Sequence, residues 1–155
     1  MKRLCKDVDI TDRGLISRAV YACFNGKYSR NDTLNYLSSI SGIRAGYILR
    51  IYKFYGKRGL KPFVEIVIEK IQKEIIDRNI SFPPIWYREK IDGSSGKVRR
   101  IGIQNIKQQL YDYVAVEGLN PVMKRIGEFQ CASIKGRGTT KGKETISRWI
   151  RNRNM

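Results

Sequence analysis

The sequence predicts a mostly helical α+β protein, with an N-terminal helical bundle followed by a basic β-hairpin and further helices. Apolar residues recur at helical spacing through residues 11–78 and again from residue 106. Between these stretches, residues 85–103 alternate in the manner of strands and are divided by a glycine-rich turn. The chain has 155 residues, 41% hydrophobic and 29% charged, which is enough to form a packed core.

Four helices are expected in residues 1–83, which we take as a helical N-terminal region. The first is expected between a cap at Thr11-Asp12 and a stop at Asn25-Gly26, and the second begins at a cap within Ser29 to Asp32. The third follows Gly42 and ends at the loop 56–59, and the fourth begins at Pro62. Rings of the third helix are interpreted as core residues and not as base-stacking platforms: Tyr47, Tyr52, Phe54 and Tyr55. The basic residues around them form either a solvated face or a nucleic-acid footprint, and the solvated face is favoured for each residue taken singly.

Residues 86–103 predict two short strands joined by a tight turn, Asp92-Gly93-Ser94-Ser95-Gly96. Basic side chains crowd this hairpin and its exit: Arg88, Lys90, Lys97, Arg99, Arg100 and Lys107. Lysine is a compact charge and arginine a planar fork, so such a finger can close over a triphosphate. Charge also protects an exposed hairpin edge from aggregation, and residue chemistry alone does not separate the two interpretations.

The remaining chain continues with helices and a second basic segment. Ser81 to Pro84 breaks the fourth helix, a further amphipathic helix is expected from Ile106, and Asn120-Pro121 is expected to open a short helix to about Ile126. A loop and a last helix from Thr139 or Thr140 follow. In this segment the glycines can bring backbone N–H groups close to a phosphodiester. Its candidate nucleic-acid-binding residues are Lys135, Gly136, Arg137, Lys141, Lys143 and Arg151.

The charge balance favours a polyanionic partner. There are 31 Lys and Arg against 14 Asp and Glu, a formal charge of +17, which points to RNA or DNA ahead of a membrane surface. No apolar run suits a spanning helix and no signal peptide is visible, so a cytoplasmic location and no membrane partner are expected. Three widely spaced cysteines indicate reduced thiols. The sequence contains no histidine, which excludes catalytic dyads and triads that depend on His and zinc sites that have a His ligand.

Two motifs carry a family resemblance. Lys90-Ile91-Asp92-Gly93 with Lys97-Val98-Arg99-Arg100-Ile101-Gly102-Ile103, and the later Gly136-Arg137-Gly138, resemble the start of bacterial reverse transcriptases of the retron, group II intron and diversity-generating branches. In that family a fingers hairpin of the form K-x-D-G…x-R precedes I-G-I, and a P-G-R-S-like turn opens the palm. The match covers roughly residues 84–152. Gln108-Gln109, Ala132 and Lys135 depart from the family pattern.

The resemblance implies a partial fingers domain of a right-hand polymerase in residues 84–155, truncated before the catalytic palm. Lys90 and Arg99 would contact the phosphates of an incoming deoxynucleotide, and Arg88, Lys97, Arg100 and Arg137 would touch template or primer. The family's metal-binding aspartates lie beyond the second motif, so no catalytic residue, metal ligand or cofactor is expected in this chain. Mg²⁺ is expected for a complete enzyme, which would need a separate palm-containing polypeptide.

Three hypotheses therefore stand. The chain is the N-terminal, fingers-side part of a reverse transcriptase that binds nucleic acid without polymerising by itself. Alternatively, it is a free-standing basic RNA- or DNA-binding module without enzymatic activity. The third possibility is a helical interaction protein whose charge serves only solubility.

Overall fold

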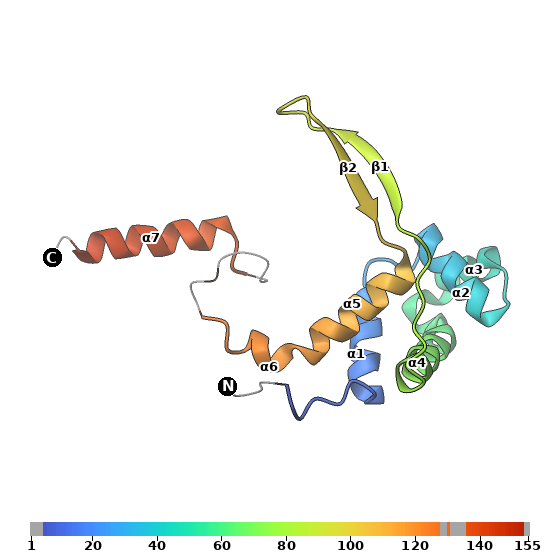
Figure 1. Cartoon of the computed structure of the whole chain (residues 1–155). Helices are drawn as coiled ribbons and strands as arrows, with labels where there is room; N and C mark the ends of the chain where they lie inside the picture. The colour runs from blue at the N-terminus through green and yellow to red at the C-terminus, as the bar shows by residue number, and fades with distance from the viewer. Residues whose placement is uncertain (1–4, 128–129, 131–135, 154–155) are drawn as a thin grey trace. The chain divides into compact units, whose positions relative to one another are not determined.

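The computed structural model describes residues 5–127, 130 and 136–153, and the chain forms two compact units. One unit is Lys6–Leu119, and the other combines Met1–Cys5 with Asn120–Met155. The first contains helices α1 to α5 and the hairpin β1–β2, and the second contains α6 and α7 (Figure 1). Compactness thus groups residues 84–119 with the helices before them, and the family-based boundary at residue 83 stays a prediction.

Four of the five helices of the first unit form where the sequence predicts them. The third continues through residues 56–59, which the sequence analysis takes as its terminating loop, with a break in helical geometry at Gly56. The bounds of the five helices are α1 Arg13–Phe24, α2 Asn31–Ser41, α3 Ala45–Gly59, α4 Lys61–Ile76 and α5 Ile106–Gly118. The Asp12 carboxylate accepts the Leu15 backbone N–H at 2.7 Å and so caps α1. Pro62 lies in the first turn of α4, where a missing N–H costs no helical hydrogen bond. The side chain of Asn105 caps α5 through the Gln108 N–H at 2.9 Å.

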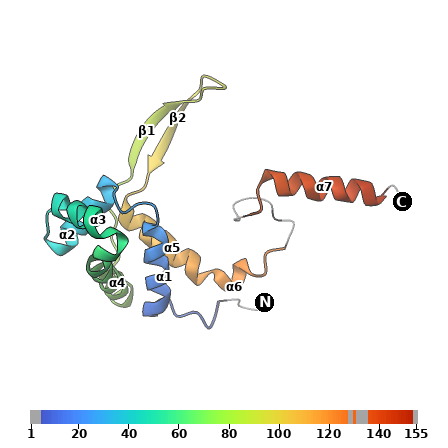
Figure 2. The same cartoon turned by 180° about the vertical axis from the view of Figure 1, so that it is seen from behind.

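The core of this unit lies where α1 packs against α4 and α5, and α2 packs against α3 and α4. Figure 2 shows α1 and α5 side by side, as in the opposite view. The apolar stripes of α1 and α4 face this core, and Leu110 and Val114 of α5 close it. Its fully buried apolar residues include Ile16, Val20, Phe24, Leu37, Ile48, Leu60, Val64, Val67, Ile68, Ile71 and Leu110.

The rings of α3 do not lie where the sequence analysis puts them. Phe54 is 84% exposed, Tyr55 72% and Tyr47 59%, so the prediction that they belong to the core is wrong. Tyr52 is half-buried and stacks on Tyr28, with ring centroids 6.1 Å apart. The physical reason is that the side of α3 facing the core is occupied by Ile48 and its partly buried aliphatic neighbours. The hydrophobicity of the aromatic rings therefore did not decide which side of α3 faces the core.

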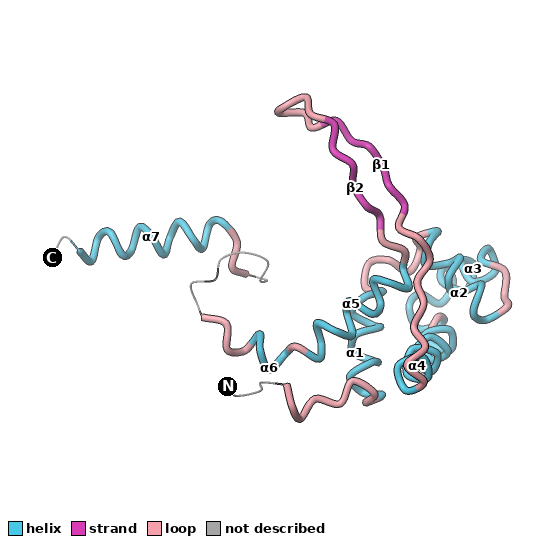
Figure 3. Tube along the Cα trace, viewed as in Figure 1, coloured by secondary structure: helices cyan, strands magenta, loops and turns pink. Residues whose placement is uncertain are grey.

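The hairpin consists of β1, Trp86–Ile91, and β2, Val98–Ile103, paired antiparallel (Figure 3). It extends away from the helices of its unit in both views. The Asp92 N–H donates to the Lys97 carbonyl at 2.9 Å, and Gly96, at a φ of 64°, donates to the Asp92 carbonyl at 2.8 Å. The predicted strand–turn–strand is confirmed.

The second unit contains two described helices, α6 (Asn120–Met123) and α7 (Thr139–Arg153). The short helix includes Asn120 itself and ends three residues earlier than the sequence analysis expects. The last helix begins at the predicted threonine. Within the described ranges, no helix combines the length and apolar character needed to cross a membrane.

Candidate nucleic-acid interface

The pairing register sorts the charges of the hairpin into two faces. Lys90 lies opposite Arg99, and Arg88 lies opposite Ile101. Because side chains alternate along a strand and paired residues share a face, Arg88, Lys90 and Arg99 lie on one face. All twelve strand residues are exposed, so neither face packs on the helices. The structure thus brings both predicted phosphate-binding residues together on a surface open to solvent.

Asp92 holds one of these two cations. Its Oδ2 lies 2.5 Å from Arg99 Nη2, and its Oδ1 accepts the Ser94 N–H at 3.1 Å and the Ser94 hydroxyl at 2.8 Å. These bonds from Ser94, with a further contribution from Arg99, hold the pKa of the Asp92 carboxyl below its usual value. The turn aspartate is therefore ionised at neutral pH. It orients the exposed Arg99 guanidinium while leaving other N–H donors available.

A shallow hollow of about 300 Å³ lies beside this pair. Its lining is Lys90, Ile91, Asp92, Gly93, Arg99 and Ile101. Within the described part of the chain, no acidic side chain forms an ion pair with Lys90. The hollow thus offers one uncommitted ammonium and one oriented guanidinium, which is a donor set suited to phosphate oxygens.

The remaining basic residues of the hairpin lie elsewhere. Arg100 lies opposite Glu89 on the second face, and its guanidinium carbon is 4.1 Å from the centroid of the Tyr87 ring. Lys97 belongs to the turn. Sequence reasoning missed Trp86, which is 76% exposed and shares the face of Arg88 and Lys90. Its place two residues before Arg88 in an alternating strand was a usable signal.

Lys107 is a predicted binding residue, but its side chain lies largely buried among the helices of the first unit. Its Nζ lies 2.9 Å from Glu74 Oε2, and only 13% of the Lys107 side chain and 18% of the Glu74 side chain are exposed. The Tyr111 hydroxyl donates to the same carboxylate at 2.6 Å. Burial raises the pKa of Glu74, but the hydrogen bonds from Tyr111 and Lys107 outweigh it, so the pKa lies below its usual value. The ammonium of Lys107 thus joins α5 to α4.

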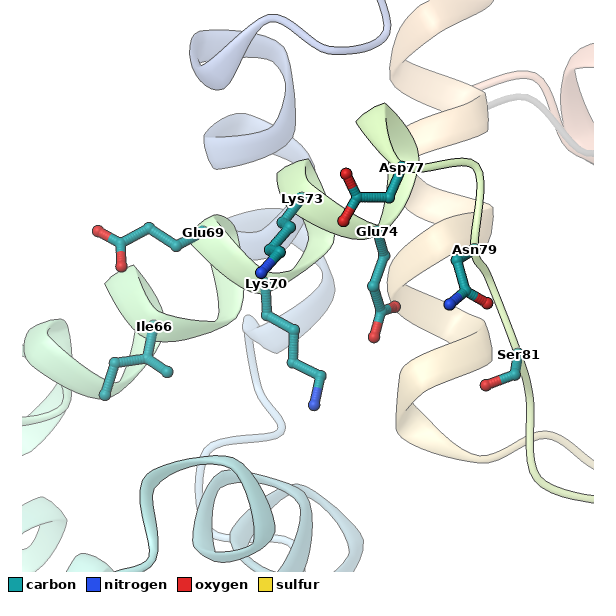
Figure 4. Close-up of a pocket in the computed structure, with 8 residues that line it drawn as sticks. All are labelled: Ile66, Glu69, Lys70, Lys73, Glu74, Asp77, Asn79 and Ser81. Carbon is teal, nitrogen blue, oxygen red and sulfur yellow. The ribbon is translucent and has the colours of Figure 1, made fainter.

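A larger pocket of about 690 Å³ runs along α4 beside this network. Figure 4 shows its lining on α4 and on the segment that follows it: Ile66, Glu69, Lys70, Lys73, Glu74, Asp77, Asn79 and Ser81. Its three carboxylates outnumber its two ammonium groups. The charge of this pocket therefore does not favour a polyanion, in contrast to the hairpin hollow.

The second predicted motif lies in the other unit. Arg137 is half-buried, and its Nη1 donates to the Gly127 carbonyl at 2.7 Å, so its guanidinium braces the backbone of residues 126–127. Gly136 adopts a φ of 78°, a left-handed conformation that favours glycine. Lys135 lies outside the described residues.

Helix α7 carries the last three predicted residues. Lys141 and Arg151 are ten residues apart and share one side of the helix with Arg148, which the sequence analysis did not select. The interval of seven residues from Lys141 to Arg148 and the interval of three from Arg148 to Arg151 can be read from the sequence and predict this row. Lys143 lies on a different side, near the exposed apolar residues Ile146 and Ile150. The helix is therefore amphipathic, with one basic row.

No group of three or more acidic or cysteine side chains is arranged to hold a metal ion within the described residues. Comparisons with protein-family models, curated proteins and solved structures found no match to this chain.

Proposed function

We propose that this chain binds nucleic acid through its hairpin, and that Lys90 and Arg99 grip phosphate groups there. The observation that carries the proposal is the pairing of these residues on one face of a hairpin that packs against no helix. A formal charge of +17 makes RNA or DNA the favoured partner. Arg88 adds a third cation to the same face, and Trp86 adds a ring on which a base can stack.

In the terms of the family resemblance, the chain acts as the fingers-side part of a reverse transcriptase. Lys90 and Arg99 would then hold the triphosphate of an incoming deoxynucleotide, and the other hairpin cations would hold template or primer. A separate palm-containing polypeptide would bring the carboxylates and Mg²⁺. We expect the chain to work in the cytoplasm and not to extend a primer by itself, and a primer-extension assay with Mg²⁺ measures this directly.

The second candidate is a free-standing RNA- or DNA-binding module. One observation favours it: Lys6–Leu119 closes on a core of its own. In this case the hairpin grips the phosphodiester backbone and needs no palm. Strong, salt-sensitive binding by the chain, with no effect of added deoxynucleotides, would select this candidate.

The decisive experiment neutralises the hairpin pair. Lys90→Ala/Arg99→Ala should weaken binding of a fluorescein-labelled single-stranded RNA about tenfold. It should also flatten the dependence of log K on log salt by about 0.7 for each phosphate that the variant no longer neutralises. The charge-matched control is Lys70→Ala/Lys73→Ala on α4, where the pocket is mixed in charge. Both pairs should unfold at the wild-type urea midpoint, since all four side chains are exposed.

Equal weakening in the two variants would show that only net charge matters, and the proposal would fail. In an enzyme reconstituted with a palm polypeptide, the hairpin variant should also raise the KM for deoxynucleotides. An unchanged KM would remove the triphosphate role and leave the nucleic-acid role.

A further inference from the structure

Helix α3 carries a second surface that neither the core nor the hairpin explains. We define the α3 surface as Tyr47, Arg50, Lys53, Phe54, Tyr55 and Arg58, all of which are exposed. Phe54 is the most exposed of the large hydrophobic side chains in the described part of the chain. A phenylalanine ring in water contributes nothing to the hydrophobic stabilisation of the fold. The fold therefore does not account for this ring, and Tyr47 and Tyr55 of the same helix are also exposed, so the rings form a group that can contact a partner.

The charge around these rings has one sign. No acidic residue occurs between Asp32 and Glu65, whereas six basic residues do: Arg44, Arg50, Lys53, Lys57, Arg58 and Lys61. Elsewhere in this unit, arginines such as Arg13 and Arg18 form ion pairs with glutamates. Among the described residues, no carboxylate pairs with Arg50, Lys53 or Arg58. The surface is therefore electrostatically complementary to a polyanion.

The spacing of these side chains places one cation between two rings. Tyr47, Arg50 and Phe54 follow one another at intervals of three and four residues, so they form one row along the helix, about 10 Å from first to last. At Gly56 the backbone leaves helical geometry, with a φ of 61° and a ψ of −152°. Few residues other than glycine adopt this conformation. Arg58, which follows this bend, is also exposed.

This arrangement favours one kind of polyanion. Exposed rings with a cation between them suit single-stranded nucleic acid, whose bases stack on aromatic side chains while its phosphates contact basic ones. A duplex keeps its bases stacked inside and cannot use the rings. An amphipathic membrane helix separates a wide apolar face from a basic face, whereas here Arg50 stands between Tyr47 and Phe54.

We infer that the α3 surface is a binding site for single-stranded RNA or DNA, with bases stacked on Tyr47 and Phe54 and phosphates held by Arg50 and Lys53. The site is separate from the hairpin in sequence and in chemistry. The hairpin face supplies paired cations for phosphate with the single ring of Trp86 near them, and the α3 surface supplies two rings with a cation between them. The inference therefore goes beyond the proposed function and does not depend on it.

The test uses the full chain and two probes of equal charge. One probe is a labelled oligothymidylate of about twelve nucleotides, and the other is an abasic oligomer with the same number of phosphates. Wild-type protein should prefer the base-bearing probe. The variant Tyr47→Leu/Phe54→Leu keeps charge and apolarity but removes both rings, so it should reduce that preference about tenfold and leave abasic binding unchanged.

Trp86→Leu on the hairpin is the control, because it removes an exposed ring from the other surface and likewise keeps charge and apolarity. If Trp86→Leu abolishes the preference and the α3 variant keeps it, the inference fails while hairpin binding stands. If the α3 variant loses the preference and Lys90→Ala/Arg99→Ala changes nothing, the proposed function fails while the inference stands. Cross-linking with an iodouracil-substituted strand should label the peptide that contains Phe54, and labelling confined to the hairpin would contradict the inference.

A membrane arm completes the test. Wild-type protein and the α3 variant are sedimented with vesicles of phosphatidylcholine and phosphatidylserine. Vesicle binding that needs Phe54, together with an unchanged preference between the two oligomers, would assign the surface to lipid and overturn the inference. Binding of both proteins to vesicles at the same level, or of neither, is the expected result.

Discussion

The helical body of Lys6–Leu119 and the hairpin that extends from it place their side chains in opposite environments. In the body, apolar residues such as Phe24 and Leu110 are fully buried, and the charged groups of Glu74 and Lys107 meet each other. In the hairpin every strand residue is exposed, including large apolar ones. An isolated two-stranded hairpin is marginal in water, and this one gains no packing from the helices. Folding explains the buried residues of the body, and the proposed binding role would explain the exposed residues of the hairpin.

The largest expected effect is on folding stability. Phe24→Ala should lower the free energy of unfolding by about 3–5 kcal/mol, because it empties a fully buried site. Trp86→Ala removes a larger ring from the hairpin, yet should change the unfolding free energy by no more than about 0.5 kcal/mol. Urea titrations followed by circular dichroism measure both. A large destabilisation by Trp86→Ala would break the comparison, since it would mean that the hairpin ring supports the fold.

Helix α7 tests whether a third segment behaves like the hairpin. Reversing Lys141, Lys143 and Arg151 to Glu should weaken RNA binding by about tenfold to a hundredfold and flatten its salt dependence. The control reverses Lys6, Lys70 and Lys73, which are exposed in the helical body. Fluorescence anisotropy at several salt concentrations measures both. An unchanged slope of log K against log salt in the α7 variant would indicate that these three residues form only a solvated surface.

The partly buried ion pair gives the body its own pH dependence. Since the pKa of folded Glu74 lies below the value of 4.5 for an unperturbed side chain, its contribution to stability is present above about pH 4.5 and lost as the pH falls through the folded pKa. Tyr111→Phe removes one of its hydrogen bonds and should cost about 1–2 kcal/mol at pH 7. The same variant should lose less stability than wild type between pH 5 and pH 3. An identical acid dependence would show that Tyr111 does not tune this carboxylate.

The smallest effect is expected at the turn of the hairpin. Asp92→Asn keeps an acceptor for the Ser94 N–H and removes the negative charge beside Lys90 and Arg99. We expect this electrostatic gain to outweigh the lost orientation of the guanidinium, so RNA affinity should rise by up to about fivefold at low salt. Glu89→Gln removes the same charge from the other face, opposite Arg100, and should have a smaller effect. Equal increases in affinity would indicate a response to net charge alone. Both variants should unfold at the wild-type urea midpoint.

Local signals in the chain predicted most of the secondary structure. A capping carboxylate at Asp12, a proline at Pro62 and the turn formers after Asp92 act through neighbours a few residues away. Such interactions can be read from spacing. The cap at Asn105 was missed, although it follows the same rule. Pairing across the hairpin also follows once the turn is located, because strand register places Lys90 opposite Arg99.

Spacing and composition were sufficient to locate most of the helices and the hairpin and to show that the chain carries excess positive charge. They did not show which charged and aromatic side chains are exposed to solvent, because that depends on how the elements pack. Lys107 and Phe54 show this most clearly, because composition suggests an exposed lysine and a buried ring, and the structure has the reverse. The physical reason is that burial depends on partners from distant segments. Glu74 lies 33 residues from Lys107, and no local pattern records that they meet.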